Sequence, residues 1–342
     1  KEMHTAFLSL LDQNASELII DLRDNPGGLL SASVAILDMI IKEDEPLVST
    51  KGRTKASNRT FFSRQKPVIP SDVKIAVLIN QGSASASEIV AGAIQDLDRG
   101  IIIGQKSYGK GLVQTQFPID EKRSIKITTA RYYVPSGRFI QKRDYIDEKY
   151  ILNKTEEDSV FTTLGGRKVL GNGGITPDST ITPKLMASLS SQYWRRGYFY
   201  SFAQRHKHQY KTFTSVERDN SIMKKFQSFI DEQEDEILLP GEKELGTVTE
   251  KIAKLDSTNS NINDALSLIS DFYGELENVR RKTESEDIRQ VILLEFAGLL
   301  DGPEGRLKQA LKDDIIVQST LDILSDKLAY ESSLTPFKVI EN

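Results

Sequence analysis

The sequence contains no cysteine and only three histidines, His4, His206 and His208. The missing cysteines exclude disulfide bonds, a thiol nucleophile and thiolate metal sites. So few histidines make a multi-histidine metal site or a histidine-based catalytic triad hard to assemble. An enzyme of this composition therefore needs another group for proton transfer.

Excess charge and long apolar runs are also absent from the sequence. The 45 Lys and Arg residues against 49 Asp and Glu give a formal net charge of −4, so nucleic acid is not an expected partner. No apolar run approaches the roughly 18 residues of a transmembrane helix, and we expect no integral membrane segment. The sequence begins at Lys1 without methionine or a signal peptide, which we interpret as a fragment or a mature form.

Two domains are expected from the length of 342 residues, at roughly 150 residues per domain. In the first half, short apolar runs alternate with amphipathic stretches, which predicts an α/β fold with a crossover-connected sheet and flanking helices. A glycine-rich stretch between Val160 and Thr182 marks the boundary, giving domains 1–182 and 183–342. The second domain shows only helical periods and is predicted to be mostly α-helical.

The pattern also places the individual elements. Strands are predicted at residues 18–22, 73–79, 101–103, 112–117 and 124–133. Helices of the first domain are predicted at residues 2–11, 29–41 and 85–97. Helices of the second domain are predicted at residues 185–205, 220–236, 245–255, 262–281, 284–300, 306–311 and 315–328.

Ser85 stands where a predicted strand, a tight turn and a predicted helix meet. Free backbone N–H groups at a helix start favour a developing negative charge, so a serine hydroxyl there can act as a nucleophile. The competing interpretation is a helix cap, because Ser85 and Glu88 have the S-x-x-E spacing of a capping box. The small residues around Ser85 favour the approach of a substrate backbone.

Lysine is the remaining candidate for a base that serves this serine, and it must be neutral near pH 7 to do so. Lys110 lies in the glycine-rich segment 104–111, which follows a strand of three isoleucines. If residues 110–116 are extended, Lys110, Leu112 and Gln114 point to one side, so Gln114 can orient the amine by a hydrogen bond. The competing interpretation is a solvated loop lysine.

The same segment has the G-x-x-x-x-G-K spacing of a phosphate-binding loop from Gly104 to Lys110. Gly111 stands where that motif needs Ser or Thr, and residues 112–115 indicate a strand where it needs a helix. Both differences argue against a nucleotide enzyme. A third candidate, residues 25–28 (NPGG), is either a simple strand-to-helix turn or a source of N–H groups for an oxyanion hole.

Three segments in this order resemble the carboxyl-terminal processing peptidases, also called tail-specific proteases. They are residues 18–28 (LIIDLRDNPGG), 80–88 (NQGSASASE) and 107–114 (SYGKGLVQ). Residues 128–138 (TTARYYVPSGR) and 173–178 (GGITPD) extend the resemblance to the predicted boundary. It therefore covers roughly residues 1–182 and implies a ClpP/crotonase-like catalytic core.

The resemblance implies a role for each matched residue. Ser85 is the nucleophile, Lys110 the general base and Gln114 the residue that positions it. The backbone N–H groups of Ala86 and Gly28 form the oxyanion hole, with Gly27 as the fallback for the second donor. Asp96 also matches the family, and we expect a structural role for it.

The implied activity is serine endoproteolysis by a Ser-Lys dyad through an acyl-enzyme, near the C-termini of protein or peptide substrates that end in apolar residues. The implied reaction requires no metal and no organic cofactor. The family also implies a location in the cell envelope, periplasmic or otherwise exported. Its members carry a PDZ domain before the first strand, whereas only about 17 residues precede it here, so we expect the core without that domain. The alternative is a catalytically silent protein-binding scaffold, in which the helical domain binds an adaptor protein or a second copy of the chain.

Overall fold

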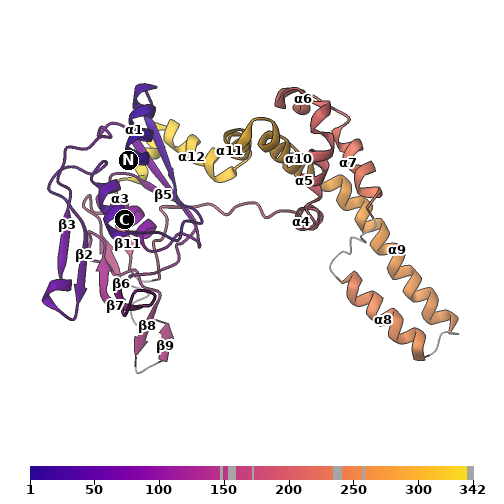
Figure 1. The fold of residues 1–342 in the computed structure, drawn as a ribbon, viewed down its shortest axis with the longest axis horizontal. Helices are drawn as coiled ribbons and strands as arrows, with labels where there is room; N and C mark the ends of the chain where they lie inside the picture. Colours follow the sequence, from indigo (N-terminus) through magenta and orange to yellow (C-terminus); the bar gives the residue numbers. More distant parts are fainter. Residues whose placement is uncertain (147–148, 153–158, 172, 234–240, 256–258, 337–342) are drawn as a thin grey trace, which may run out of the picture. The chain divides into compact units, whose positions relative to one another are not determined.

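The computed structural model describes residues 1–146, 149–152, 159–171, 173–233, 241–255 and 259–336 (Figure 1). The chain divides into two compact units, which we call the sheet unit (Lys1–Pro183 with Ile316–Asn342) and the helical unit (Lys184–Ile315). The first segment of the sheet unit thus ends beside the expected boundary at residue 182. Residues from Ile316 onward return to the sheet unit, whereas the sequence analysis assigned all of 183–342 to the helical domain.

A parallel sheet forms the centre of the sheet unit. Its strand order is β1-β4-β5-β12, and each neighbouring pair is parallel. The strands are β1 (Glu17–Asp21), β4 (Lys74–Ile79), β5 (Ile101–Gly104) and β12 (Ser179–Thr180). The first three confirm the strands expected from continuous apolar runs, which are typical of parallel strands covered on both faces.

Helices from different parts of the chain cover the two faces of this sheet. Alternate residues of β4 point to opposite sides. Ile75, Val77 and Ile79 pack in one core with residues of α1 (Glu2–Asp12), α2 (Leu30–Leu37) and α3 (Ala86–Asp96). Ala76 and Leu78 pack in another core, with residues of α12 (Ile315–Ser325) and α13 (Lys327–Ser333). The C-terminal helices therefore complete the sheet unit because they bury the second face of its sheet.

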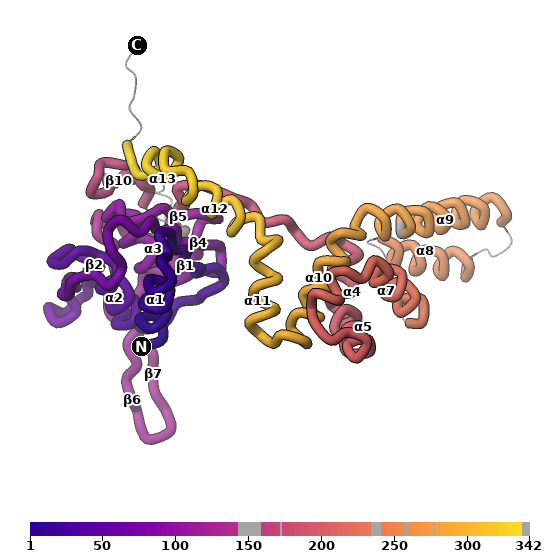
Figure 2. Tube along the Cα trace, turned by 90° about the horizontal axis from the view of Figure 1, so that it is seen from above, coloured from indigo at the N-terminus to yellow at the C-terminus, as the bar shows by residue number. Residues whose placement is uncertain are grey.

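An antiparallel sheet with the order β3-β2-β7-β6 lies in the same unit. It contains β2 (Pro46–Gly52), β3 (Arg59–Phe62), β6 (Leu112–Pro118) and β7 (Ser124–Tyr133). The two long strands confirm the expectation, and Figure 2 shows them as a hairpin that extends from the unit. The sequence analysis missed β2 and β3, because β2 runs from a proline to a glycine and β3 has only four residues.

Short elements complete the sheet unit. They are the 3-10 helix η1 (Lys55–Ser57), the hairpin of β8 (Arg143–Ile146) and β9 (Lys149–Leu152), and the pair of β10 (Val160–Thr162) and β11 (Lys168–Leu170). None of the helices within the described ranges is long and apolar enough to cross a membrane.

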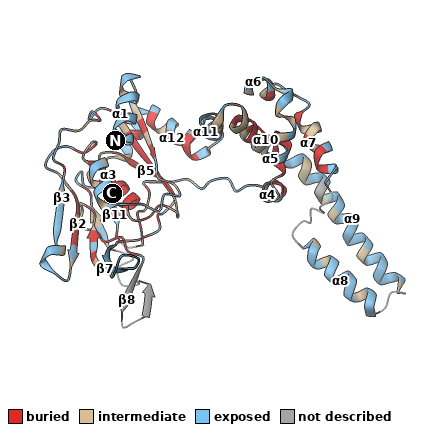
Figure 3. Cartoon of the chain, viewed as in Figure 1, coloured by how far each residue is buried: buried red, intermediate tan, exposed pale blue. Residues whose placement is uncertain are grey.

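The described part of the helical unit contains helices and no strand, as expected. Its elements are α4 (Ser188–Arg195), α5 (Tyr198–His206), η2 (Lys207–Gln209), α6 (Phe213–Glu217), α7 (Ile222–Asp231), α8 (Glu242–Leu255), α9 (Ser260–Thr283), α10 (Ser285–Leu300) and α11 (Gly302–Lys312). The single helix expected at 185–205 is two helices, because Gly197 adopts a left-handed conformation with φ of 71°. Aromatic rings of α4, α5, α7 and α10 form the core, whereas α8 and α9 are largely exposed (Figure 3).

Candidate active site

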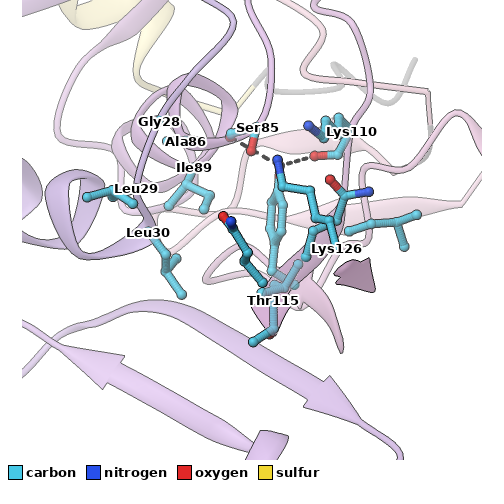
Figure 4. Close-up of a pocket in the computed structure, with 14 residues that line it drawn as sticks. Gly28, Leu29, Leu30, Ser85, Ala86, Ile89, Lys110, Thr115 and Lys126 are labelled. Atoms are coloured by element: carbon cyan, nitrogen blue, oxygen red, sulfur yellow. Dashed lines mark hydrogen bonds between the residues drawn. The ribbon is translucent and has the colours of Figure 1, made fainter. Parts of the chain in front are cut away.

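One pocket in the sheet unit brings together all five residues expected to form a catalytic site. It has a volume of about 490 Å³, and its lining includes Gly28, Ser85, Ala86, Lys110 and Gln114 (Figure 4). These residues come from three separate segments of the chain, namely the turn after β1, the start of α3 and the connection from β5 into β6. The pocket therefore lies where the three segments that resemble the peptidases meet.

Ser85 occupies a strained position between β4 and α3. Its backbone has φ of 56° and ψ of −115°, a region that residues other than glycine rarely adopt. Such outliers cluster at functional sites, where surrounding contacts hold them in place. The strained turn lets Ser85 line the pocket while helix α3 begins at the next residue, Ala86.

The two neighbouring serines, Ser83 and Ser87, hydrogen-bond the protein backbone and do not line the pocket. The Ser83 hydroxyl donates to Leu22 O at 2.7 Å, and the Ser87 hydroxyl donates to Asn25 O at 3.0 Å. Both side chains are buried, and neither lines the pocket. These hydrogen bonds connect the Ser85 turn to the turn after β1. Of the three serines in residues 83–87, Ser85 is the one that lines the pocket.

The glycine turn at residues 25–28 lies directly against the Ser85 turn. Gly27 has φ of +91°, and a Cβ atom there would lie 2.5 Å from Ala84 O and 2.7 Å from Ala86 N. The Gly27 N–H donates to Asn25 Oδ1 at 2.9 Å. Gly28 has open space around it and lines the pocket. Close packing thus explains Gly27, whereas Gly28 is the glycine with a backbone that faces the pocket.

The buried carboxylate of Glu88 joins the Ser85 turn to the Lys110 loop. Its Oε2 accepts the N–H groups of Ser85 at 2.8 Å and Lys110 at 2.9 Å. Its Oε1 accepts the Ser107 hydroxyl at 2.6 Å and the Gly109 N–H at 2.7 Å. One side chain therefore sets the backbone positions of both candidate reacting residues. The capping-box spacing was the sequence signal for Glu88, but it gave no sign of the contacts with the lysine loop.

Burial raises the pKa of the Glu88 carboxyl above its ordinary value, and the hydrogen bonds from Ser107, Lys110, Gly109 and Ser85 oppose this shift. The four donors satisfy the lone pairs that burial removes from water. Burying the Glu88 carboxylate costs free energy, and the four hydrogen bonds offset part of that cost.

Tyr132 of β7 is a second residue that the sequence analysis missed. Its hydroxyl hydrogen-bonds Ser85 O at 3.1 Å and also Lys110 O. Burial raises the pKa of this phenol well above its ordinary value, and the nearby Glu88 carboxylate raises it further. The hydroxyl therefore remains a donor, and it links the backbone segments of Ser85 and Lys110, which Glu88 also joins.

The side chains of the candidate dyad share the pocket without a hydrogen bond between them. In the described part of the chain, no hydrogen bond joins the Ser85 hydroxyl to the Lys110 amine, or the Gln114 amide to that amine. A β-bulge between Val113 and Gln114 interrupts the simple alternation that the sequence analysis assumed for residues 110–116. Lys110, Leu112 and Gln114 nevertheless all line the pocket.

Asp96, the remaining matched residue, lies away from the pocket and is buried. Its carboxylate pairs with Arg138 at 2.7 Å and accepts the Ser136 N–H at 2.9 Å. These contacts join α3 to the segment after β7, which agrees with the expected structural role. Across the described ranges, no group of three or more histidine, aspartate or glutamate side chains could hold a metal ion.

Comparison with known proteins matches one family model to the part of the chain that contains the pocket. Residues 1–150 match the model of peptidase family S41. The resemblance to the carboxyl-terminal processing peptidases is thereby confirmed for this part of the chain.

Individual relatives carry the same name. The chain is 49% identical over 123 residues to a carboxy-terminal-processing protease of Bartonella bacilliformis, covering 36% of this chain and 28% of the relative. It is 37% identical over 151 residues to a carboxyl-terminal-processing protease of Synechocystis sp., covering 44% of this chain and 34% of the relative. The chain thus spans about a third or less of the length of these relatives.

Among solved structures, the chain is similar to a photosystem II D1 C-terminal processing protease. The two share 29% sequence identity with a TM-score of 0.40, over 54% of this chain and 39% of that chain.

Proposed function

We propose that this chain carries the catalytic part of a serine endopeptidase that cleaves protein substrates near their C-termini. The observation that carries the proposal is the single pocket lined by Ser85, Lys110 and Gln114 together with Gly28 and Ala86. The match of residues 1–150 to peptidase family S41 supports the reaction class, and the names of the relatives support the place of cleavage.

In the proposed mechanism, the Ser85 oxygen attacks the scissile carbonyl carbon while the Lys110 amine accepts the hydroxyl proton. The resulting ammonium gives that proton to the leaving nitrogen, and the peptide bond breaks to leave an acyl-enzyme. Water then attacks the ester, again losing its proton to Lys110, and Ser85 is regenerated. The dyad side chains close to hydrogen-bonding distance when substrate is bound, as catalytic contacts often do.

The oxyanion of each tetrahedral intermediate is proposed to bind the backbone N–H groups of Gly28 and Ala86. Ala86 is the first residue of α3, where the helix dipole favours negative charge. Gly28 is preferred to Gly27 because the Gly27 N–H already donates to Asn25. Gln114 is proposed to orient the Lys110 amine once the substrate has ordered the pocket.

The apolar part of the pocket fits apolar side chains next to the scissile bond. Leu29, Leu30, Ile89, Leu112 and Val113 line it. We therefore propose that the substrates are proteins with unfolded C-terminal tails that end in apolar residues. The finer fold assignment, a ClpP/crotonase-like core, rests on the family resemblance and the parallel sheet β1-β4-β5-β12, and an exported, cell-envelope location rests on the family alone.

The proposal is tested by cleavage of β-casein, an unstructured protein, with the variants Ser85→Ala and Lys110→Ala. We expect each to lower kcat by at least about 10³-fold, because the members of a catalytic unit act together. Lys106→Ala is the matched control, since Lys106 lies in the same loop but outside the pocket lining.

Undiminished cleavage by either active-site variant contradicts the mechanism. If the wild-type chain cleaves nothing and instead binds a protein through residues 184–315, the scaffold alternative takes its place. Thermal unfolding of each variant shows whether the fold is retained.

A further inference from the structure

The pocket contains a second lysine that has no role in the proposed mechanism. Fourteen residues line the pocket, and the two basic side chains among them are those of Lys110 and Lys126, with no aspartate or glutamate. Lys110 has a role in proton transfer. Lys126 has none, although a lone cation beside apolar walls attracts a negatively charged group.

Lys126 is placed in the pocket by the register of the β6–β7 hairpin. It lies opposite Gln116 on β6, and cross-strand partners share one face of a sheet. In Figure 4 its side chain extends toward the end of the pocket that holds Ser85 and Lys110. The ammonium group is therefore presented to whatever occupies the pocket.

Both arginines of this hairpin have partners within the protein, whereas the side chains of its two lysines, Lys122 and Lys126, have none among the described residues. Arg123 pairs with Asp120 at the tip, and the Arg131 guanidinium lies 5.1 Å from the centre of the Phe139 ring. Within the described ranges, Lys126 makes no ion pair and no side-chain hydrogen bond. Its partner is consequently sought in the substrate.

We propose that Lys126 binds a carboxylate of the substrate and so determines which bonds are cleaved. The inference rests on the proposed function. A pocket of about 490 Å³ holds only a few residues, so the carboxylate lies within a few residues of the scissile bond. It comes either from the C-terminus of the substrate chain or from an acidic side chain, and both present the same chemistry to an ammonium group.

Binding measurements separate this inference from catalysis. Three fluorescein-labelled hexapeptides of alanine, leucine and valine are made, with a free C-terminal carboxylate, with a C-terminal amide, and with an amide plus one glutamate in place of alanine. Anisotropy measures their binding to the full chain carrying Ser85→Ala, which cannot complete cleavage. We expect at least one carboxylate peptide to bind about tenfold more tightly than the neutral amide, as is typical of a charge-assisted contact. The tighter carboxylate peptide identifies the source.

The Lys126→Met variant, in the same Ser85→Ala chain, should lose this preference, and Lys126→Arg should keep it. Lys122→Met is the matched control, because Lys122 is an exposed lysine near the tip of the same hairpin, outside the pocket lining. Added salt should weaken the preference, since mobile ions screen the charges.

Equal binding of all three peptides, no binding of any, or an unchanged preference in Lys126→Met overturns the assignment of Lys126. Cleavage of β-casein by the wild-type chain is scored separately. The peptidase proposal can therefore stand while the role of Lys126 fails, and the reverse outcome is equally visible.

Discussion

At the scale of single residues, Glu88 has the largest influence on the geometry of the pocket. It is fully buried, yet four donors from Ser85, Ser107, Gly109 and Lys110 surround its two oxygens. A carboxylate accepts at both oxygens, whereas an amide of the same shape accepts at one and donates at the other. The four hydrogen bonds therefore favour the ionised form of Glu88, whereas its burial favours the neutral form.

We predict that Glu88→Gln lowers kcat on β-casein about 10–100-fold with little change in KM. The amide nitrogen would face either the Ser85 and Lys110 N–H groups or the Ser107 hydroxyl and the Gly109 N–H group. Either arrangement leaves buried donors unpaired at a cost of about 1–3 kcal/mol. Steady-state kinetics at several substrate concentrations measure the two parameters separately. A rise in KM alone would show that Glu88 acts on binding and not on the reacting geometry.

The pH dependence of stability provides the control for this variant. Burial raises the folded-state pKa of Glu88 above its unfolded value, which is about 4.3. The folded state therefore holds the Glu88 proton more tightly than the unfolded state does. The stability that this proton adds is fully present below the unfolded-state pKa, and it is lost as the pH rises through the raised folded-state pKa. Urea unfolding should therefore show the stability of wild type, relative to Glu88→Gln, falling as the pH rises across this range.

At the scale of elements, the sequence predicted the strands and helices that carry the site. Continuous apolar runs identified β1, β4 and β5, and the strand predicted at residues 112–117 corresponds to β6. Residues from three motifs then met in one pocket because the carboxyl ends of parallel strands lie at one edge of a sheet. The contacts of Glu88 and Tyr132 could not be predicted, since both depend on how separate segments meet and leave no periodic signal.

For helices α12 and α13, the sequence pattern predicted the helices but not the surface that they cover. Their helical period was recognised, but the period does not reveal which surface an amphipathic helix covers. Ile316, Val317 and Leu324 cover the sheet face formed by Ala76, Leu78, Ile101 and Ile103. The Tyr330 hydroxyl accepts the Ile75 N–H at 3.0 Å and donates to the Ile75 carbonyl at 3.2 Å.

We predict that Tyr330→Phe destabilises the sheet unit by about 1–3 kcal/mol, because buried polar groups of Ile75 lose their partner. Hydrogen exchange of β4, followed by mass spectrometry, should speed up accordingly. Tyr200→Phe is the matched control, since Tyr200 is an exposed tyrosine of α5. In this variant the amides of β4 should exchange at the wild-type rate. Unchanged exchange in Tyr330→Phe would mean that α13 contributes little to the sheet.

At the scale of the whole molecule, the helical unit has a core of its own. Phe199, Phe202, Phe226, Phe229 and Phe296 are buried in it, and several of their rings pack edge to face, as between Phe202 and Phe226 with centroids 5.1 Å apart. Such pairs add to the stabilisation from buried area. This core is assembled entirely from residues of the unit Lys184–Ile315.

We predict that a fragment of residues 184–315 folds alone and unfolds cooperatively on heating. Circular dichroism at 222 nm measures loss of helix, and the fluorescence of Trp194, the single tryptophan of the chain, reports on α4. The two signals should change at the same temperature. A broad, gradual loss of helix would show that the unit needs the rest of the chain.

The order of the segments along the chain has a consequence for synthesis. The ribosome completes the pocket residues by Tyr132, but the residues that cover the second sheet face follow only from Ile316. Until then the nascent protein holds a sheet with one apolar face bare to water, so its folded state is incomplete. A product that stops before Ile316, even with every pocket residue present, therefore lacks the helices that cover and stabilise the sheet beneath Ser85.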